Sequence, residues 1–150
     1  MVACPKGVNT GGPEALHQLA SSVSSFGFET FLWDPNSNEI QNQNDNYFLR
    51  YEATWTNSPP SKGDALIIPE VMGHLVPKFY GECQCILWWL SVDNFYISNK
   101  IPFDILLHGF PKVIHATQSE YARNFLEVRG VHNIAMLTDY LNRDFIEVIA

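Results

Sequence analysis

A chain of 150 residues fits one domain and is long enough to bury a substantial core. Its nine Lys and Arg residues against sixteen Asp and Glu residues give a net charge of -7, which disfavours binding to nucleic acid and to anionic lipid. The composition, 46% hydrophobic and 13% aromatic, belongs to a globular protein and excludes general disorder.

The apolar runs and the cysteines indicate a soluble, cytoplasmic protein without a metal centre. The longest apolar run, residues 85–90, is far shorter than the roughly 20 residues that a membrane-spanning helix needs. No basic stretch followed by an apolar one, the mark of a secretory signal, stands at the N-terminus. Cys4, Cys83 and Cys85 include no second pair with metal-ligand spacing, so we expect neither a zinc site nor a disulfide framework. Cys83 and Cys85 are expected on one face of a buried strand.

The first predicted elements are a strand, a helix and a second strand. An apolar start at residues 1–4 leads into a glycine turn, and apolar residues then recur at helical spacing behind Pro13 until Gly27 stops the helix. Residues 28–33 follow as a strand. This order is a βαβ unit, which requires a right-handed crossover and a parallel sheet.

The middle of the chain alternates between polar and apolar segments. Residues 36–46 are almost wholly polar and are expected to form a surface loop. Residues 47–55 are expected to form a short helix or turn. Residues 64–69 are a continuous apolar run, typical of a strand covered on both faces, and a helix is expected from Glu70 to about Tyr80.

The remainder of the chain repeats this alternation. Residues 84–90, 113–116 and 133–137 are predicted as strands, and a helix between the last two is expected to begin at a Ser119 cap and to stop at Gly130. Strands alternating with helices predict a single α/β domain with a doubly wound, mostly parallel, Rossmann-like sheet. Ligands of such sheets bind at the carboxyl ends of the strands.

The turn before the first helix is the strongest functional signal. Gly11 and Gly12 let backbone N–H groups approach a ligand closely. The start of the helix adds unpaired donors and a partial positive charge. Such a turn suits an anion, typically a phosphate.

Further polar residues follow the predicted strands and are expected to line the same edge of the sheet. A carboxylate there would deprotonate or orient a hydroxyl group while the glycine turn holds a phosphate. For the three glutamates, the alternative is a simple preference for helix N-termini through the helix dipole. The candidate set, with the glycine pair included, is Gly11, Gly12, Glu14, Glu70, Asp93, Asn94, Ser119 and Glu120.

Several common catalytic signatures are absent from the sequence. The glycines do not form G-x-G-x-x-G and no Gly-Lys-Ser/Thr follows them, so neither the dinucleotide fingerprint nor the P-loop is present. No G-x-S-x-G and no His-Glu-x-x-His motif occurs, which removes the commonest hydrolase and zinc-protease interpretations. The five histidines are scattered and are better explained as surface or core residues than as metal ligands.

Four segments together resemble the N-terminal domain of bacterial GT-B-type glycosyltransferases. The first is GGPEALHQLA at residues 11–20, with a helix end at residues 26–27. The others look like strand-to-helix junctions of that class: DALIIPE at 64–70, WWLSVDN at 88–94 and QSEYA at 118–122. The resemblance covers nearly the whole chain.

This resemblance implies a two-domain enzyme that transfers a sugar from a nucleotide-sugar to a glycan or lipid-linked acceptor, without a metal ion or other cofactor. The N-terminal domain of such enzymes binds mainly the acceptor. Their glycine turn approaches the donor diphosphate across the interdomain cleft, which assigns that role to Gly11 and Gly12. Retaining members often carry a His in a strand-end loop where this chain has Asp93 and Asn94, so Asp93 is the candidate catalytic residue.

The C-terminal, nucleotide-sugar-binding domain of this class has no counterpart in the sequence, and the first strand is shorter than is usual there. The chain is therefore expected to be a fragment that is inactive alone. We expect it to self-associate through the surface that the second domain would cover. The full-length enzyme is expected in the cytoplasm, peripheral to the inner membrane.

Two other functions stay open at this point. The first is a stand-alone, non-catalytic Rossmann-like module that binds a ligand or a partner. The second is a small doubly wound enzyme such as a phosphatase or a reductase, which the sequence favours less because no nucleophile stands at a strand end in a recognisable setting.

Overall fold

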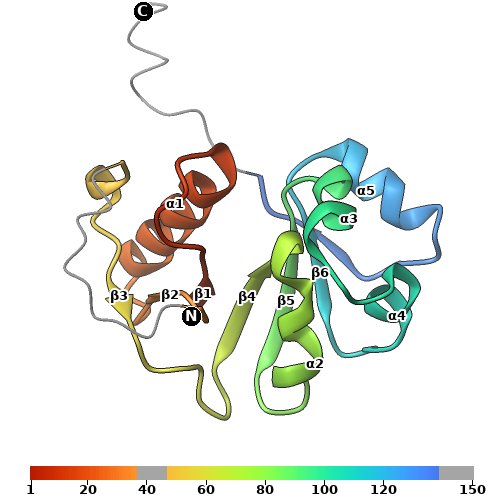
Figure 1. Ribbon diagram of the computed structural model, residues 1–150, viewed down its shortest axis with the longest axis horizontal. Coiled ribbons are helices and arrows are strands. Elements are labelled where there is room, and N and C mark those ends of the chain that lie inside the picture. Colours follow the sequence, from red (N-terminus) through yellow and green to blue (C-terminus); the bar gives the residue numbers. More distant parts are fainter. Residues whose placement is uncertain (37–46, 139–150) are drawn as a thin grey trace, which may run out of the picture.

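The computed structural model describes residues 1–36 and 47–138, which form a seven-stranded sheet with helices on both faces (Figure 1). Each strand pairs in parallel with its neighbours, in the order β3-β2-β1-β4-β5-β6-β7. This sheet confirms the predicted single-domain, Rossmann-like α/β class. The strands are β1 (Val2–Ala3), β2 (Leu32–Trp33), β3 (Trp55–Thr56), β4 (Ala65–Pro69), β5 (Gln84–Trp89), β6 (Ile114–Thr117) and β7 (Ile134–Met136).

The helices that connect the strands differ greatly in length. Helix α1 (Gly11–Ser25) has 15 residues, and short 3-10 segments occur where the chain turns sharply. No helix within residues 1–36 or 47–138 is long and apolar enough to cross a membrane. The other helical segments are η1 (Leu49–Tyr51), η2 (Glu70–Leu75), α2 (Val76–Phe79), η3 (Val92–Asn94), α3 (Phe95–Ser98), α4 (Phe103–His108) and α5 (Glu120–Glu127).

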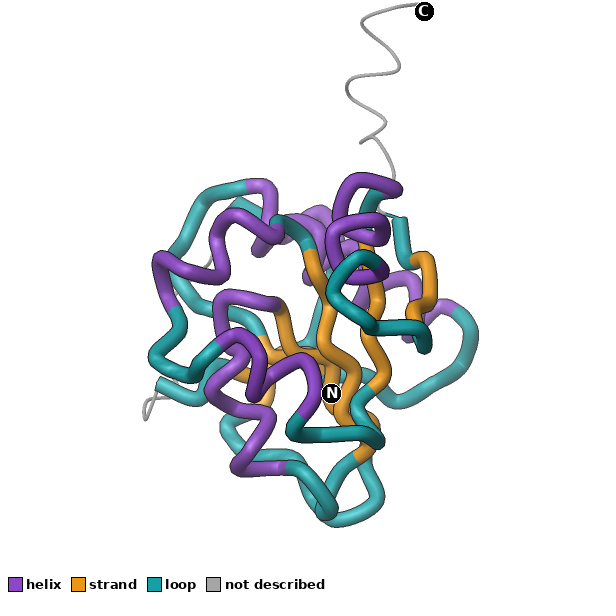
Figure 2. Tube along the Cα trace, turned by 90° about the vertical axis from the view of Figure 1, so that its right-hand side faces the viewer, coloured by secondary structure: helices purple, strands orange, loops and turns teal. Residues whose placement is uncertain are grey.

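The two faces of the sheet pack against different helices. On β5, Cys85, Leu87 and Trp89 belong to a core shared with α2 to α5, whereas Trp88 belongs to a second core shared with α1. This alternation follows from the two-residue period of a strand. Cys83 is buried in the same core as Cys85, which confirms that the two thiols lie on one face of the sheet, although Cys83 directly precedes β5 and only Cys85 belongs to the strand. Figure 2 shows the strands running alongside one another between the helical segments.

The strand order reverses between β1 and β4. From β1 the chain adds β2 and then β3 on one side, and it then crosses back to place β4 on the other side of β1. The segment after β1 is α1, which packs on one face, and the segment after β4 is η2, which packs on the other. Because these connections diverge, a crevice opens between the carboxyl ends of β1 and β4.

The predicted glycine stops and the predicted serine cap are confirmed. Gly27 follows α1 with a φ of 89°, and Gly130 follows α5 with a φ of 83°. Both are left-handed conformations that glycine adopts without steric strain. At the start of α5, the Ser119 Oγ accepts a hydrogen bond from the Ala122 N–H at 3.2 Å.

Two predicted elements differ from the structure. The strand predicted over residues 28–33 comprises only β2. The continuous helix predicted from Glu70 to about Tyr80 is wrong, because η2 and α2 occupy these residues and the backbone leaves the helical conformation at Met72. Pro77 has no N–H to donate to the Gly73 carbonyl, which accepts the Val76 N–H instead, so a continuous α-helix through these residues would lack one hydrogen bond.

The structure also contains elements in segments for which the sequence predicts little or nothing. The sequence predicts no element between residues 90 and 113, and the structure has η3, α3 and α4 there. Helices α3 and α4 have four and six residues, too few to show a periodic pattern in the sequence. Residues 47–55 are expected to form a short helix or turn. Within them Leu49–Tyr51 form η1, and Trp55 begins β3, a strand that the sequence does not predict. The loop predicted at residues 36–46 lies outside the described residues from residue 37 onwards.

Substitution of Gly73 tests the close packing of η2 against α3 and α4. A Cβ at this position would lie 2.8 Å from Leu106 Cδ2 and 3.0 Å from Asn99 Oδ1, and Leu106 is fully buried. We expect Gly73→Ala to lower the free energy of unfolding by about 1–3 kcal/mol, measured by chemical denaturation. As a control, Gly11→Ala adds a Cβ with nothing within 4 Å and should cost nothing. Equal losses in both variants would contradict the packing described.

Candidate functional site

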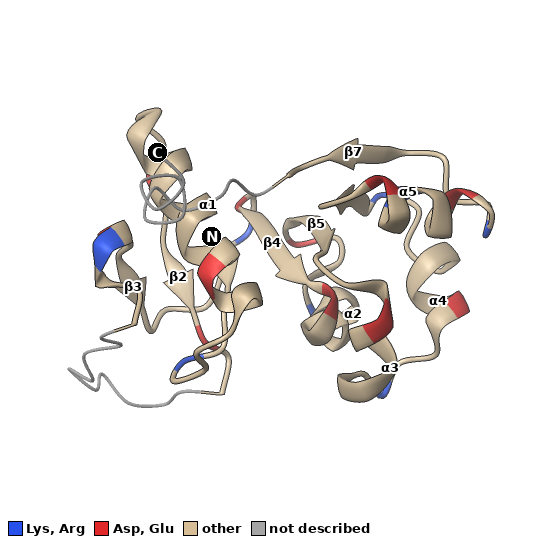
Figure 3. Cartoon of the chain, turned by 90° about the horizontal axis from the view of Figure 1, so that it is seen from above, with Lys and Arg blue, Asp and Glu red and all other residues tan. Residues whose placement is uncertain are grey.

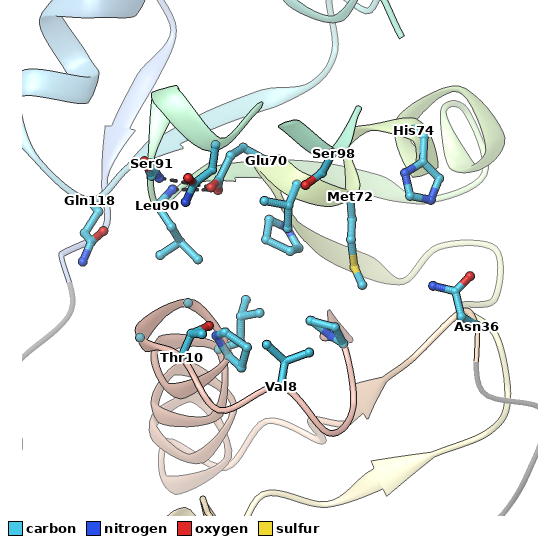
Figure 4. A pocket seen from close by; sticks show the side chains of 18 residues that line it. Val8, Thr10, Asn36, Glu70, Met72, His74, Leu90, Ser91, Ser98 and Gln118 are labelled. Carbon is cyan, nitrogen blue, oxygen red and sulfur yellow. Dashed lines mark hydrogen bonds between the residues drawn. The ribbon is translucent and has the colours of Figure 1, made fainter. Parts of the chain in front are cut away.

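A cavity of about 700 Å³ lies at the point where the strand order reverses (Figure 4). The start of α1 forms one wall, and the turns that follow β4 and β5 form the other. This is the place at which doubly wound domains bind their ligands. The volume falls in the range of small-molecule sites, about 300–1,000 Å³.

The wall on the α1 side is built from the glycine turn. Thr10 precedes the helix with an extended backbone (φ -139°, ψ 169°), and among the described residues its side chain makes no capping hydrogen bond. The N–H groups of Gly11 and Gly12 therefore have no intrahelical acceptor and no side-chain cap. An added Cβ at Gly11 would meet nothing within 4 Å, and at Gly12 it would lie 3.9 Å from Leu90 Cδ1. The glycine pair thus keeps backbone donors accessible at the rim of the pocket.

The opposite wall is organised by the buried carboxyl group of Glu70. Its Oε2 accepts the Leu90 N–H at 2.9 Å and its Oε1 accepts the Ser91 N–H at 3.2 Å, as the dashed lines in Figure 4 show. The residue is 2% exposed, and this burial raises the pKa of the carboxyl group to about 7, although the backbone hydrogen bonds oppose the shift. Glu70 therefore fastens the turn after β5 to the end of β4.

Asn99 stabilises the same wall through hydrogen bonds to its backbone. Its side-chain amide donates to the backbone carbonyls of Glu70 and Phe95, and its Oδ1 accepts the His74 N–H at 3.2 Å. These bonds hold η2 against α3. They set the positions of His74 on η2 and of Ser98 on α3, both of which line the pocket.

The pocket lining contains two titratable side chains, Glu70 and His74, and within the described residues it contains no Lys or Arg. Two basic residues, Lys6 and Arg50, make contacts with residues outside the pocket lining. The Lys6 Nζ lies 4.8 Å from the ring centre of Trp55, and the Arg50 guanidinium forms an ion pair with Glu14.

The structure brings half of the predicted site residues together. Gly11, Gly12, Glu70 and Asn94 all line the pocket, although they come from three different turns. They converge because the carboxyl ends of parallel strands lie at one edge of the sheet. The sequence prediction of these residues rests on the same principle.

The other half of the predicted site residues lies outside the pocket lining. Glu14 faces η1, where it accepts the Tyr51 hydroxyl at 2.7 Å and pairs with Arg50. Ser119 caps α5, and Glu120 is exposed in the first turn of the same helix, as the helix-dipole alternative would have it. Asp93 is exposed on η3.

Several lining residues were missed by the sequence analysis. Gln118 directly follows β6 and Ser91 closely follows β5, so the strand-end argument that selected Asn94 applies equally to them. Ser98 and His74 carried no such signal, because their places depend on α3 and on the irregular path of η2.

The buried histidines are core residues with hydrogen-bond partners. The His115 Nδ1 accepts the Trp89 Nε1–H at 3.0 Å, and burial, assisted by His108, lowers the pKa of His115 to about 4. The His17 Nδ1 donates to the Pro13 carbonyl at 2.8 Å. Neither residue lines the pocket. Within the parts of the chain that the structure describes, no group of three or more His, Cys, Asp or Glu side chains is placed to hold a metal ion.

Comparison with known proteins gives no relative: no family model, no curated protein and no solved structure matches the chain. The pocket and the sequence resemblance are therefore the features that bear on the function of the chain.

Substitution of Glu70 tests whether its carboxyl group is buried in a way that favours the protonated form. A folded pKa of about 7 lies above the ordinary value of 4.5, so the stability that the protonated group contributes is complete below pH 4.5 and is lost as the pH rises through 7. We expect the unfolding free energy of the wild type, relative to that of Glu70→Gln, to fall by up to about 3 kcal/mol over this range.

Chemical denaturation at a series of pH values measures this difference. Glu120→Gln is the matched control, because Glu120 is exposed in the first turn of α5 and should leave the slope of the profile unchanged. Parallel pH profiles for the wild type and Glu70→Gln would contradict the buried state assigned to Glu70.

Proposed function

We propose that this chain is the acceptor-side domain of a GT-B-type glycosyltransferase, which transfers a sugar from a nucleotide-sugar to a glycan or lipid-linked acceptor. The observation that carries the proposal is the pocket at the strand reversal, lined by Gly11, Gly12, Glu70 and Asn94. These are residues that the sequence resemblance and the strand-end argument select independently of any coordinates.

The chemistry of the pocket supports a sugar as its occupant. Hydroxyl and amide side chains from Ser91, Asn94, Ser98 and Gln118 offer both donors and acceptors to sugar hydroxyl groups. The glycine turn at the rim presents backbone donors to a diphosphate that lies outside the pocket. With no Lys or Arg in the described lining, the charge of that diphosphate requires cations from a second domain.

Exposed apolar side chains near the carboxyl edge of the sheet support the docking of such a second domain. Val8 stands in the turn after β1, Tyr96 and Ile97 lie on α3 after β5, and Tyr121 lies in the first turn of α5. Ile97 is 82% exposed. Large apolar residues in these positions suit an interdomain contact.

A second candidate function is a stand-alone ligand-binding module. It is favoured by one observation: both walls of the pocket come from this chain. A module of this kind would bind its ligand unaided, whereas half of a two-domain enzyme would bind a nucleoside diphosphate weakly.

The proposal predicts that the chain alone does not transfer sugar. Positioning and diphosphate stabilisation supply most of the catalysis in this reaction, and both require the second side of the cleft. Incubation with nucleotide-sugars and simple glycoside acceptors should release nucleotide at the background rate. Turnover at an ordinary enzymatic rate, about 1 s⁻¹ or faster, would contradict the proposal.

The apolar edge predicts concentration-dependent self-association. Ile97→Ser should shift the chain towards the monomer in sedimentation velocity experiments, because it removes apolar surface beside the pocket. Val128→Ser is the matched control, since Val128 is 79% exposed but lies at the far end of α5. A clean monomer that binds nucleoside diphosphate with micromolar affinity would favour the stand-alone module instead.

A further inference from the structure

The polar side chains that line the pocket are almost all uncharged. Figure 4 shows hydroxyl and amide groups distributed over both walls and at both ends. Such groups can hydrogen-bond a neutral ligand, because each offers both a donor and an acceptor. The uncharged polar residues of the lining are Thr10, Asn36, Ser91, Asn94, Ser98 and Gln118.

Between these groups the lining is apolar. Val8 and Leu16 contribute from the α1 side, and Met72 and Leu90 contribute from the opposite side. A mainly apolar lining with a few convergent polar groups is the usual composition of small-molecule sites. It suits a ring that carries C–H groups on its faces and hydroxyl groups at its edge.

The charges of the lining side chains distinguish this pocket from an anion-binding site. The carboxyl group in the wall belongs to Glu70, and no Lys or Arg belongs to the described lining. Lys6 turns towards Trp55 and Arg50 pairs with Glu14, and neither of these residues lines the pocket. Figure 3 shows how the Lys and Arg residues of the described chain are scattered. His74 is the remaining lining residue able to carry a positive charge.

We propose that the pocket selects an uncharged pyranose and rejects the matching sugar acid. This inference rests on the proposed function, since it specifies the sugar that occupies the acceptor pocket. A carboxylate in the pocket would lose hydration without meeting a counter-charge, and Glu70 would add repulsion wherever the pH is high enough to ionise it. The half-charge of the α1 N-terminus acts at the rim and is too small to balance a full negative charge within.

The test compares sugars that differ only at C6. Methyl glycosides of glucose, galactose and mannose, and the three matching uronates, are titrated into the full 150-residue chain, and backbone amide shifts are followed by NMR. At least one neutral glycoside should shift the amides of Gly11, Gly12, Ser91 and Asn94. Its uronate should bind at least about tenfold more weakly. The same ratio in His74→Gln would show that the imidazole does not supply a cation.

A gain-of-charge variant makes the test sharper. Ser98→Lys places the missing cation in the lining at an exposed position and should raise the affinity for the uronate by about tenfold. Ser24→Lys is the matched control, because it adds the same charge at an exposed site about 20 Å along α1 from Gly11. The control should leave the preference for the neutral sugar unchanged.

The outcomes separate this inference from the function on which it rests. A uronate that binds in the pocket as tightly as its neutral partner, or more tightly, overturns the inference but does not contradict the proposed acceptor-domain function. The absence of pocket shifts with all six glycosides also overturns it. If a nucleoside diphosphate alone occupies the pocket instead, the proposed acceptor function fails as well.

Discussion

The pairing of β1 with β4 is the constraint on which the candidate site depends. Val2 pairs with Ile67 there, and the Ile67 N–H donates to the Met1 carbonyl at 3.0 Å. This contact joins the β1-β2-β3 half of the sheet to the β4-to-β7 half, and it does so where the chain direction across the sheet reverses. Since α1 and η2 leave this point on opposite faces, the pocket between them is a consequence of strand order rather than of any single side chain.

Glu70 converts this open crevice into a defined wall. It stands directly after β4 and binds the first two N–H groups beyond β5, so it ties two neighbouring strand ends together. A carboxyl group buried in this way costs stability when it ionises, which a hydrophobic residue would avoid. Two backbone N–H groups at the pocket wall would, however, then lack their acceptor. The shape of this wall therefore depends on the carboxyl group of one residue.

The sequence was sufficient for those features that depend on local patterns. Gly27, Ser119 and Gly130 mark helix ends by their own backbone or side-chain chemistry, and the structure places the ends of α1 and α5 beside them. Pro13 was expected to be the first helical residue, but α1 begins two residues earlier, at Gly11. The alternation of apolar runs predicted the parallel sheet, and the positions of the strand ends predicted that Gly11, Gly12, Glu70 and Asn94 would be neighbours.

These local patterns did not predict which residues would contact one another across the fold. Glu14 stands in the first turn of α1, yet Tyr51 and Arg50, which are distant in the sequence, draw it away from the pocket. His74 and Ser98 reach the pocket only because Asn99 fixes two helices that are too short or too irregular to predict.

The most direct test of the central claim is a crystal structure of this chain grown with a neutral methyl glycoside at high concentration. The account predicts one sugar ring between the glycine turn before α1 and the turn after β5, with the Leu90 and Ser91 N–H groups still bound to Glu70. A ring bound on another face while this pocket holds only water would contradict it, as would a sheet in which β1 and β4 are not neighbours.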